Sequence, residues 1–317
     1  MVIIIKCLWQ YLVIICFFSF FEFMKVAALI ITYNPDLDLL KKNIDAIINQ
    51  VDHLLVFDNC SANVKGVSQV CSEYKKICLQ NSSENIGISK AVNWAEDYFP
   101  KEYEWFLTLD QDSICPDNLI SEYLRYVPLQ DVAMMSPVIQ LPSGRLAQSS
   151  SSNDEFEYVS KCITSACFVN REAFRDVGKM DEQLFIDNVD HDLCKRFLIR
   201  GYRIIRCNNV KLFHNMGSST PVALFEFLHK YIGTKVVYQT YSPFRIYYLI
   251  RNSIYFLRKY CDYSSYTERW YYIKLMVWHV AAKSLVVGPN RWKIVFSILN
   301  GIRDGFKMKK SLIKNRK

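Results

Sequence analysis

The sequence predicts an α/β fold in which a mainly parallel sheet is flanked by helices and followed by a helical C-terminal extension. From Val26 onward, short apolar runs alternate with segments whose apolar residues recur at helical spacing. This alternation is typical of βαβ units and of parallel strands buried on both faces. Residues 221–317 differ, because they combine aromatic, Lys and Arg residues at helical spacing. The 317 residues, 51% of them hydrophobic, are enough to build a sizeable core.

The expected elements follow one another in a regular order. Four strands are expected first, at 26–33, 53–58, 76–81 and 104–110. The helices between them are expected at 37–50, 68–74 and 87–99. Later in the chain we expect a polar loop or irregular hairpin at 141–157, a strand at 162–170, a helix near 189–200 capped by Gly201, and a further strand.

The first 23 residues are almost wholly apolar, with Lys6 and Glu22 as their only charges. A stretch of this length is a candidate membrane span, whereas a signal peptide fits poorly because no small-x-small cleavage site follows. Two interpretations stay open: a membrane anchor, or an annotation artefact in which translation starts at Met24. We therefore expect three parts, namely a leader at 1–23, an α/β domain at 24–218 and a basic aromatic region at 219–317.

Charge and cysteine usage narrow the class of protein. The net charge is +8, and from Arg291 onward nine Lys or Arg residues accompany a single acidic residue. Clustered basic charge indicates an anionic partner, and since no nucleic-acid recognition motif is present we expect no nucleic acid. The eleven cysteines are scattered without a CxxC or zinc-site spacing, which indicates free thiols in a reducing cytosol.

Polar residues follow each of the first four expected strands. Parallel sheets bind ligands at the carboxyl ends of their strands, so these residues are expected at one edge of the sheet. They are Asn34, then Asp58 with Asn59, then Asn85 with Gly87, and finally Asp110 with Asp112.

The pair Asp110 and Asp112 raises a question of charge. In an extended chain, residues two apart point to the same face, so the two carboxylates would repel each other. Mg²⁺ or Mn²⁺ is the most economical compensation, because both take oxygen ligands and are often shared between carboxylates and substrate phosphates. The metal would neutralise a departing diphosphate. The alternative is a solvated turn before Pro116.

Several segments together resemble a known family. "ITYNPDLDLL", "QVDHLLVFDNCSAN", "ENIGISKAVN", "LTLDQDS", "LFIDNVDHDLCKRFLIRGY" and "LFHNMGSS" occur in the order found in inverting glycosyltransferases of the GT-A (nucleotide-diphospho-sugar transferase) fold. The QVD…DN-S and LDQDS motifs and the segment "PFRIYYLIRNSIYFLRK" at 243–259 are similar to those of the bacterial rhamnosyltransferase branch. The resemblance covers about residues 26–259 and implies that 24–218 is a catalytic domain.

The resemblance implies roles for the matched residues. The first nucleotide-contacting loop would consist of Thr32, Tyr33 and Asn34, and the Asp58 carboxylate would bind the base or ribose. The segment that packs under the nucleotide would contain Asn85, Gly87 and Asn93. Asp110 and Asp112 would form the metal and diphosphate site, and His214 would be a further metal ligand. Structural alternatives stay open for three of these positions. Asp58 could cap a turn, Asn85 and Gly87 could only begin a helix, and His214 could be an ordinary hydrogen-bonded histidine.

The catalytic base is expected in "DNVDHD". The resemblance aligns Asp190 with the base of an E-D-x-D segment, although Val189 stands where Glu is frequent. An inverting transfer needs one carboxylate to take the proton of the acceptor hydroxyl. On a helix, Asp187 and Asp190 would share a face, whereas Asp192 has Arg196 as an i+4 partner. We predict Asp190 as the base, Asp187 as second choice and Asp192 as structural; the alternative is a solvated acidic helix start.

The predicted function is an inverting, metal-dependent sugar transfer, most simply of L-rhamnose from dTDP-rhamnose. The acceptor would be a lipid-linked O-antigen or capsule precursor at the inner face of the cytoplasmic membrane, with the chain cytoplasmic and peripheral. The expected interfacial helix places Trp292, Ile294, Val295, Ile298, Leu299 and Ile302 on or near one side.

Three other functions stay open. The donor could be a UDP-hexose or UDP-galactofuranose. The chain could be a sugar-phosphate nucleotidyltransferase, but that enzyme needs a Gly-rich basic loop where this sequence has "TYNPD". It could also be a non-catalytic, membrane-associated scaffold.

Overall fold

The computed structural model describes residues 24–141, 146, 154–214, 220–221, 237–238, 241–282, 284–285, 290–311 and 313. The apolar leader and most of the loop expected at 141–157 lie outside the described residues. Within the described ranges, no helix combines the length and apolar character needed to cross a bilayer.

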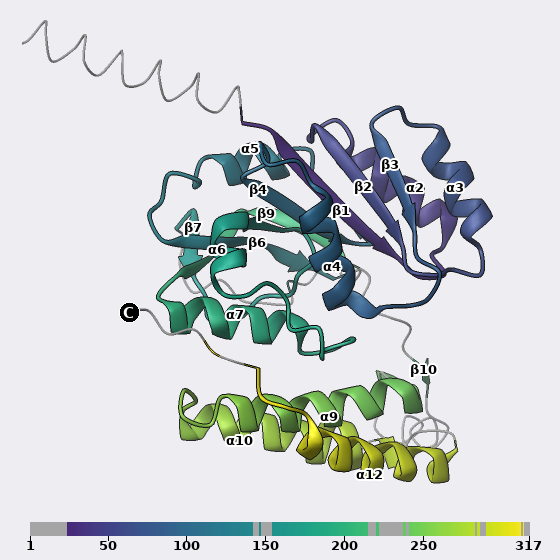
Figure 1. Ribbon diagram of the computed structural model, residues 1–317, viewed down its shortest axis with the longest axis vertical. Coiled ribbons are helices and arrows are strands. Elements are labelled where there is room, and N and C mark those ends of the chain that lie inside the picture. Colours follow the sequence, from purple (N-terminus) through teal and green to yellow (C-terminus); the bar gives the residue numbers. More distant parts are fainter. Residues whose placement is uncertain are drawn as a thin grey trace, which may run out of the picture.

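A nine-stranded sheet forms the centre of the molecule (Figure 1). Its first half has the order β3-β2-β1-β4, with every neighbour parallel. The expected strands of this half are confirmed, and β1 is buried almost throughout, as its continuous apolar run indicates. The four strands are β1 (Val26–Thr32), β2 (His53–Asp58), β3 (Ile77–Asn81) and β4 (Trp105–Asp110).

The second half of the sheet mixes strand directions. β8 (Cys167–Asn170) runs antiparallel between β4 and β6 (Val132–Gln140), and β6 pairs in parallel with β9 (Arg203–His214). Two short strands, β5 (Ser113–Ile114) and β7 (Phe156–Tyr158), run antiparallel to β9. The expected strand at 162–170 is shorter than predicted, because the backbone turns through a positive φ at Ala166 before β8 begins.

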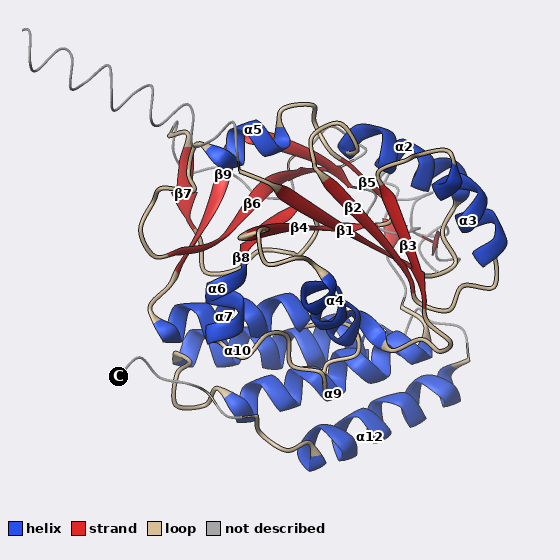
Figure 2. Ribbon diagram, turned by 45° about the horizontal axis from the view of Figure 1, so that its top comes forward, coloured by secondary structure: helices blue, strands red, loops and turns tan. Residues whose placement is uncertain are grey.

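Helices cover both faces of the sheet. Figure 2 shows α2, α3 and α5 on one side of the sheet and α4, α6 and α7 on the other. Leu40 and Val67 belong to the first core, whereas Ala91 and Phe197 belong to the second. The helices are α2 (Leu37–Ile47), α3 (Val64–Ser72), α4 (Gly87–Tyr98), α5 (Leu119–Leu124), α6 (Arg171–Asp176) and α7 (Val189–Arg200).

The C-terminal region is helical, as predicted. It contains α9 (Pro243–Lys259), α10 (Tyr266–Lys274), the π-helix η1 (Leu275–Ala282) and α12 (Arg291–Lys307). In both views α9 lies next to the α/β domain (Figures 1 and 2), and α9 also packs closely against α12. Two glycines permit this approach: a Cβ on Gly301 would lie 2.9 Å from a backbone oxygen of α9, and one on Gly305 would lie 2.7 Å from another.

The apolar residues of α12 do not share one side, and this part of the prediction was wrong. Ile294 is buried against α9, and Ile298 packs on the same cluster. Trp292 and Leu299 instead face solvent, together with Phe296, Ile302 and Phe306. The helix therefore has a packed face and a separate exposed apolar face.

Candidate active site

Strand register brings the ends of the first four strands together. Thr32 pairs with Asp58, Asp58 with Asn81, and Ile31 with Asp110. The predicted convergence of polar strand ends on one edge of the sheet is therefore confirmed. This is the edge at which α/β sheets bind ligands.

Asp58 lies at the centre of this edge and is fully buried. Its carboxylate accepts hydrogen bonds from Thr32 Oγ1 at 2.9 Å and from the Ser61 backbone N–H at 2.8 Å. Ser61 Oγ in turn accepts from the Asn34 N–H at 2.8 Å. A buried carboxylate needs such partners, so Asp58 fixes the loops after β1 and β2 relative to each other. Direct contact between Asp58 and a nucleoside stays a prediction.

The loop after β1 presents two exposed side chains at the same edge. Asn34 has a positive φ of 49°, which turns the chain sharply, and the Tyr33 ring is 50% exposed. The Tyr33 N–H donates to Gln111 Oε1 at 2.7 Å. Gln111 is the middle residue of the D-x-D turn, so the expected nucleotide loop and the expected metal site are directly hydrogen-bonded.

Gly87 begins α4 at a point where no side chain fits. Its φ is 79°, and a Cβ would lie 2.7 Å from the carbonyl oxygen of Phe185. The same oxygen accepts from the Ile88 N–H at 2.8 Å, while Asn85 Oδ1 accepts from the Gly87 N–H at 3.0 Å. The start of α4 therefore holds the loop that precedes α7.

Asn93 binds the same loop one turn further along α4. It is buried, and its amide exchanges two hydrogen bonds with the backbone of Met180, at 2.8 and 3.1 Å. A third runs to Glu182 Oε1 at 3.0 Å. Asn85, Gly87 and Asn93 thus act together in positioning residues 180–187, and their packing under a nucleotide stays a prediction.

Asp110 is the last residue of β4, and the chain turns at 111–112 before β5. The expectation that Asp110 and Asp112 share one face of an extended strand was wrong for this reason. Both carboxylates are half-buried. Asn43 Nδ2 donates to the Asp110 carbonyl at 2.7 Å, and the next strand residue, Ser113, pairs with the backbone of His214. The His214 side chain lies outside the described residues.

The D-x-D turn can supply two carboxylates to a cation. Among the described side chains, no group of three or more His, Cys, Asp or Glu residues is arranged to hold a metal. A donor set of two carboxylates nevertheless fits Mg²⁺ or Mn²⁺, because these ions commonly complete their oxygen ligands with phosphates and water. Asp110 and Asp112 therefore fit a metal that is shared with a diphosphate.

Asp187 precedes α7 and does not belong to it. Both Asp187 and Asn188 have positive φ, near 62° and 61°, and the helix begins at Val189, so the predicted i, i+3 helical pairing of Asp187 with Asp190 was wrong. Asp187 Oδ1 accepts from Arg245 at 3.1 and 3.3 Å. Oδ2 is buried with no hydrogen-bond partner among the described residues. Burial raises the pKa of Asp187, and Arg245 opposes this effect.

Asp190 lies in the first turn of α7 and is partly exposed. One carboxylate oxygen accepts from the His191 N–H at 2.8 Å. The negative charge of Asp190 is the smallest of the influences that act on the pKa of Asp187, and it raises that pKa.

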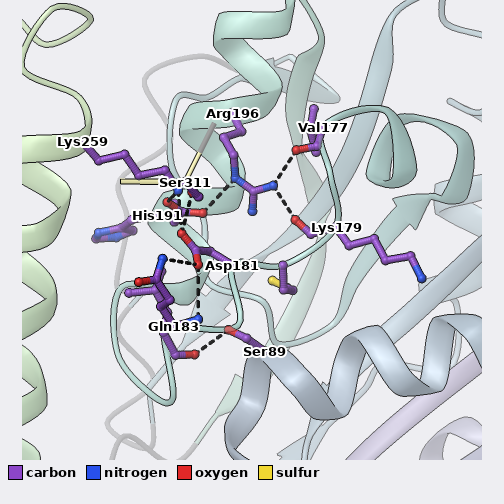
Figure 3. Close-up of polar contacts among 12 residues, drawn as sticks. Ser89, Val177, Lys179, Asp181, Gln183, His191, Arg196, Lys259 and Ser311 are labelled. Atoms are coloured by element: carbon purple, nitrogen blue, oxygen red, sulfur yellow. Dashed lines mark hydrogen bonds and ion pairs between the residues drawn. The ribbon is translucent and has the colours of Figure 1, made fainter. Parts of the chain in front are cut away.

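Asp192 is structural, as predicted. Its carboxylate is buried between Arg196, at 2.8 Å, and Lys259, at 2.6 Å, and it accepts from the Tyr260 hydroxyl at 2.7 Å. Lys259 also reaches Asp181 at 2.8 Å. Figure 3 shows Arg196, Lys259 and Asp181 converging on this network, which joins α7 to α9.

No role was predicted for the α9 residues that hold the base loop, the segment 180–190 that contains both predicted catalytic carboxylates. Arg245 binds Asp187, the ring of Tyr248 stacks on Phe185 at a centroid distance of 5.2 Å, and Asn252 Nδ2 donates to the Asp187 carbonyl at 2.9 Å. These α9 residues recur every three to four positions along the segment resembling R-x-YY-x-x-RN. This periodicity could have identified them from the sequence, because it places them on one face of a helix.

Comparisons with known proteins agree with this geometry. Residues 27–177 match the family model described as Glycosyl transferase family 2. The chain is 27% identical over 306 residues to dTDP-rhamnosyl transferase RfbF of Shigella flexneri, covering 88% of this chain and 96% of that protein.

Solved structures show the same fold at low identity. The mannosyltransferase PcManGT from Pyrobaculum calidifontis, in complex with GDP-Man and Mn²⁺, is 12% identical, with a TM-score of 0.54 over 91% of this chain and 76% of that one. S. aureus TarS 1-349 in complex with UDP-GlcNAc is 13% identical, with a TM-score of 0.52 over 90% and 81%.

The sheet, the converging strand ends and these similarities define a glycosyltransferase of the GT-A fold. Residues 27–177 are similar to the glycosyl transferase family 2 model, and the chain as a whole is similar to a dTDP-rhamnosyl transferase.

Proposed function

We propose that this glycosyltransferase moves L-rhamnose from dTDP-rhamnose, with inversion, onto a lipid-linked polysaccharide precursor. The convergence of Thr32, Asp58 and Asp110 at one sheet edge carries the proposal, because it would let one nucleotide sugar contact the ends of three strands. The similarity to a dTDP-rhamnosyl transferase along 88% of the chain supports the donor. The similar structures hold GDP- and UDP-sugars, so a UDP-hexose or UDP-galactofuranose stays the alternative donor.

Within residues 24–218, which we propose as the catalytic domain, the donor would occupy the edge formed by β1, β2 and β4. Tyr33 and Asn34 are exposed there and would face the nucleoside, while Asp58 holds their loop in place. Asp110 and Asp112, with His214 as a further ligand, would hold Mg²⁺ or Mn²⁺, which supplies positive charge to the departing diphosphate when bound.

Asp190 would act as the base. It would take the proton of the acceptor hydroxyl while that oxygen forms its bond to the anomeric carbon. The bond from that carbon to the nucleoside diphosphate breaks, and its electron pair leaves with the diphosphate. Arg245, whose side chain is exposed and binds Asp187, would add positive charge beside the diphosphate.

The exposed apolar face of α12 would place the enzyme on a membrane. Trp292 is 78% exposed, and Phe296, Leu299 and Phe306 follow it along the same helix. Basic residues flank this face, which is the pattern of an interfacial helix on anionic lipid. We propose peripheral binding to the inner face of the cytoplasmic membrane.

A donor panel tests the proposed function. The enzyme would be incubated with dTDP-rhamnose, UDP-hexoses and UDP-galactofuranose, a lipid-linked acceptor extract and Mn²⁺, and the product mass would identify the transferred sugar. We expect a deoxyhexose increment with dTDP-rhamnose alone. A hexose increment with a UDP donor would replace the proposed donor. Absence of any product, together with absence of dTDP or UDP binding in calorimetry, would favour the scaffold alternative.

A further inference from the structure

A pocket of about 340 Å³ with both polar and apolar walls opens beside the proposed base. It lies between α7, the start of α10 and the chain at 160–161, and its lining includes Lys161, His191, Lys195 and Glu268. His191 directly follows Asp190, and its Nδ1 is 2.9 Å from the Tyr272 hydroxyl of α10. The pocket therefore begins within one residue of the carboxylate proposed to activate the acceptor.

The pocket carries more positive than negative charge. Lys195 Nζ lies 2.8 Å from one oxygen of Glu268, and Lys161 Nζ lies 4.0 Å from the other. Two ammonium groups thus share one carboxylate. Burial lowers the pKa of Lys161, and Glu268 only partly offsets this. An anion in the pocket would satisfy both ammonium groups.

An apolar hollow of about 490 Å³ continues along the same helix. Its lining includes Trp270, Tyr271, Val277 and Trp278, and the Trp278 side chain is 66% exposed. Lys161 links the two spaces, because its Nζ lies 4.9 Å from the centre of the Tyr271 ring. A basic pocket and an apolar surface therefore lie next to each other along α10 and η1.

We propose that these two hollows bind the phosphorylated lipid carrier of the acceptor. The carrier's phosphate would contact Lys161 and Lys195, and its hydrocarbon chain would lie on Trp270 and Trp278. The attached sugar would then extend toward Asp190. This inference rests on the proposed transfer to a lipid-linked acceptor. The two ammonium groups lie in one hollow of about 340 Å³ rather than spread over a surface, which fits one phosphate head group better than a bilayer of anionic lipids.

Vesicle binding distinguishes the proposed lipid carrier from a bilayer of anionic lipids. Phosphatidylcholine vesicles would contain either a polyprenyl diphosphate or phosphatidylglycerol at equal total charge, and binding would be measured by co-sedimentation. We expect the wild-type protein to bind the polyprenyl diphosphate vesicles at least 10-fold more tightly. Lys161→Gln is expected to weaken that binding about 10-fold, the effect of losing one charge-assisted contact, and to leave phosphatidylglycerol binding unchanged.

Further variants serve as matched controls. Lys65→Gln removes the same charge from exposed α3 and is expected to change neither binding. Trp278→Ser is expected to weaken binding to the polyprenyl vesicles selectively, whereas Trp292→Ser on α12 should weaken binding to both kinds of vesicle. Equal binding of Lys161→Gln and wild type to polyprenyl diphosphate, or equal wild-type affinity for the two vesicles, would overturn the inference. Calorimetry of dTDP on the same preparations tests the donor site separately, so that the proposed function can stand or fall independently.

Discussion

The sheet edge at the ends of β1, β2 and β4, proposed to bind the donor and called the donor edge here, is built differently from the base loop. At the donor edge, Thr32, Asp58 and Asp110 lie together because adjacent parallel strands end at the same register. The base loop has no strand to hold it. Asp187 is instead fixed by α9, through Arg245 and Asn252, which lie 58 and 65 residues further along the chain.

This difference explains how each half should respond to mutation. At the donor edge the sheet supplies the geometry, so a side chain at its rim can be removed with little structural consequence. At the base loop, two successive residues with positive φ are held by side-chain contacts from a distant helix. Changes there are expected to alter geometry and protonation as well as chemistry.

The largest effect is expected at the donor edge. Asp112→Ala should lower transfer by more than about 10³-fold, because one of two carboxylates for the cation is lost. The melting temperature should change little, since Asp112 is half-buried on a turn. Product formation by mass spectrometry and a thermal melt measure the two quantities. Wild-type activity in this variant would remove the metal assignment.

Asp190→Asn probes the base loop directly. We expect kcat to fall about 10²- to 10⁴-fold, the usual contribution of a general base, with dTDP affinity unchanged. Asp187→Asn is the matched comparison and should cost less. The assignment would be reversed if Asp187→Asn proved the more damaging of the two in steady-state kinetics.

The polar network of Asp181, Asp192 and Lys259, which joins α7 to α9, predicts that the fold becomes less stable at acidic pH. Burial alone would raise the pKa of Asp181, but Lys259, Tyr255 and Ser311 lower it to about 2. A depressed carboxyl pKa stabilises the fold above the unfolded-state value near 4, and this stabilisation is lost as the pH falls from about 4 to about 2. It amounts to about 2 kcal/mol.

Urea unfolding of wild type and Asp181→Asn at pH 7 and at acidic pH checks this linkage. The difference in the free energy of unfolding between the two proteins should shrink as the pH approaches 2. A difference that stays constant over this range would show that the ionised form of Asp181 is not the stabilising species.

The smallest of these effects is expected from Arg245→Gln, which should lower kcat about 10-fold by removing one charge-assisted contact. Loss of the guanidinium raises the pKa of Asp187 further, because burial is then unopposed. Carbon-13 NMR titration of the Asp187 carboxyl should therefore show a higher pKa than in wild type, and Arg245→Lys should restore part of the activity. An unchanged pKa of Asp187 would limit Arg245 to a packing role.

The parallel half of the fold and the donor edge could be predicted because their signals are local. Each of β1 to β4 is a short apolar run followed by polar residues, and a parallel register then requires Asp58 and Asp110 to lie near each other. The same local signal was weaker in β6, because Pro137 lies inside this strand and a register shift follows it. That strand was not predicted.

The base loop could be predicted only in part, because its geometry depends on contacts between distant segments. Helical spacing suggested that Asp187 and Asp190 share a face, yet the Arg245 and Asn252 contacts hold Asp187 before the helix begins. The pairing of Asp192 with Arg196 was predicted because it is an i, i+4 contact within one helix. The second partner of Asp192 is Lys259 on α9, and no sequence pattern near Asp192 indicates this distant contact.

Calorimetry of dTDP with and without Mn²⁺, on wild type and on Asp112→Ala, tests most directly whether the strand ends form a donor site with a cation. We expect wild type to bind dTDP with an affinity that rises at least 10-fold when Mn²⁺ is added, and we expect the variant to lose this rise. Identical binding by both proteins, with or without Mn²⁺, would contradict the donor site described above.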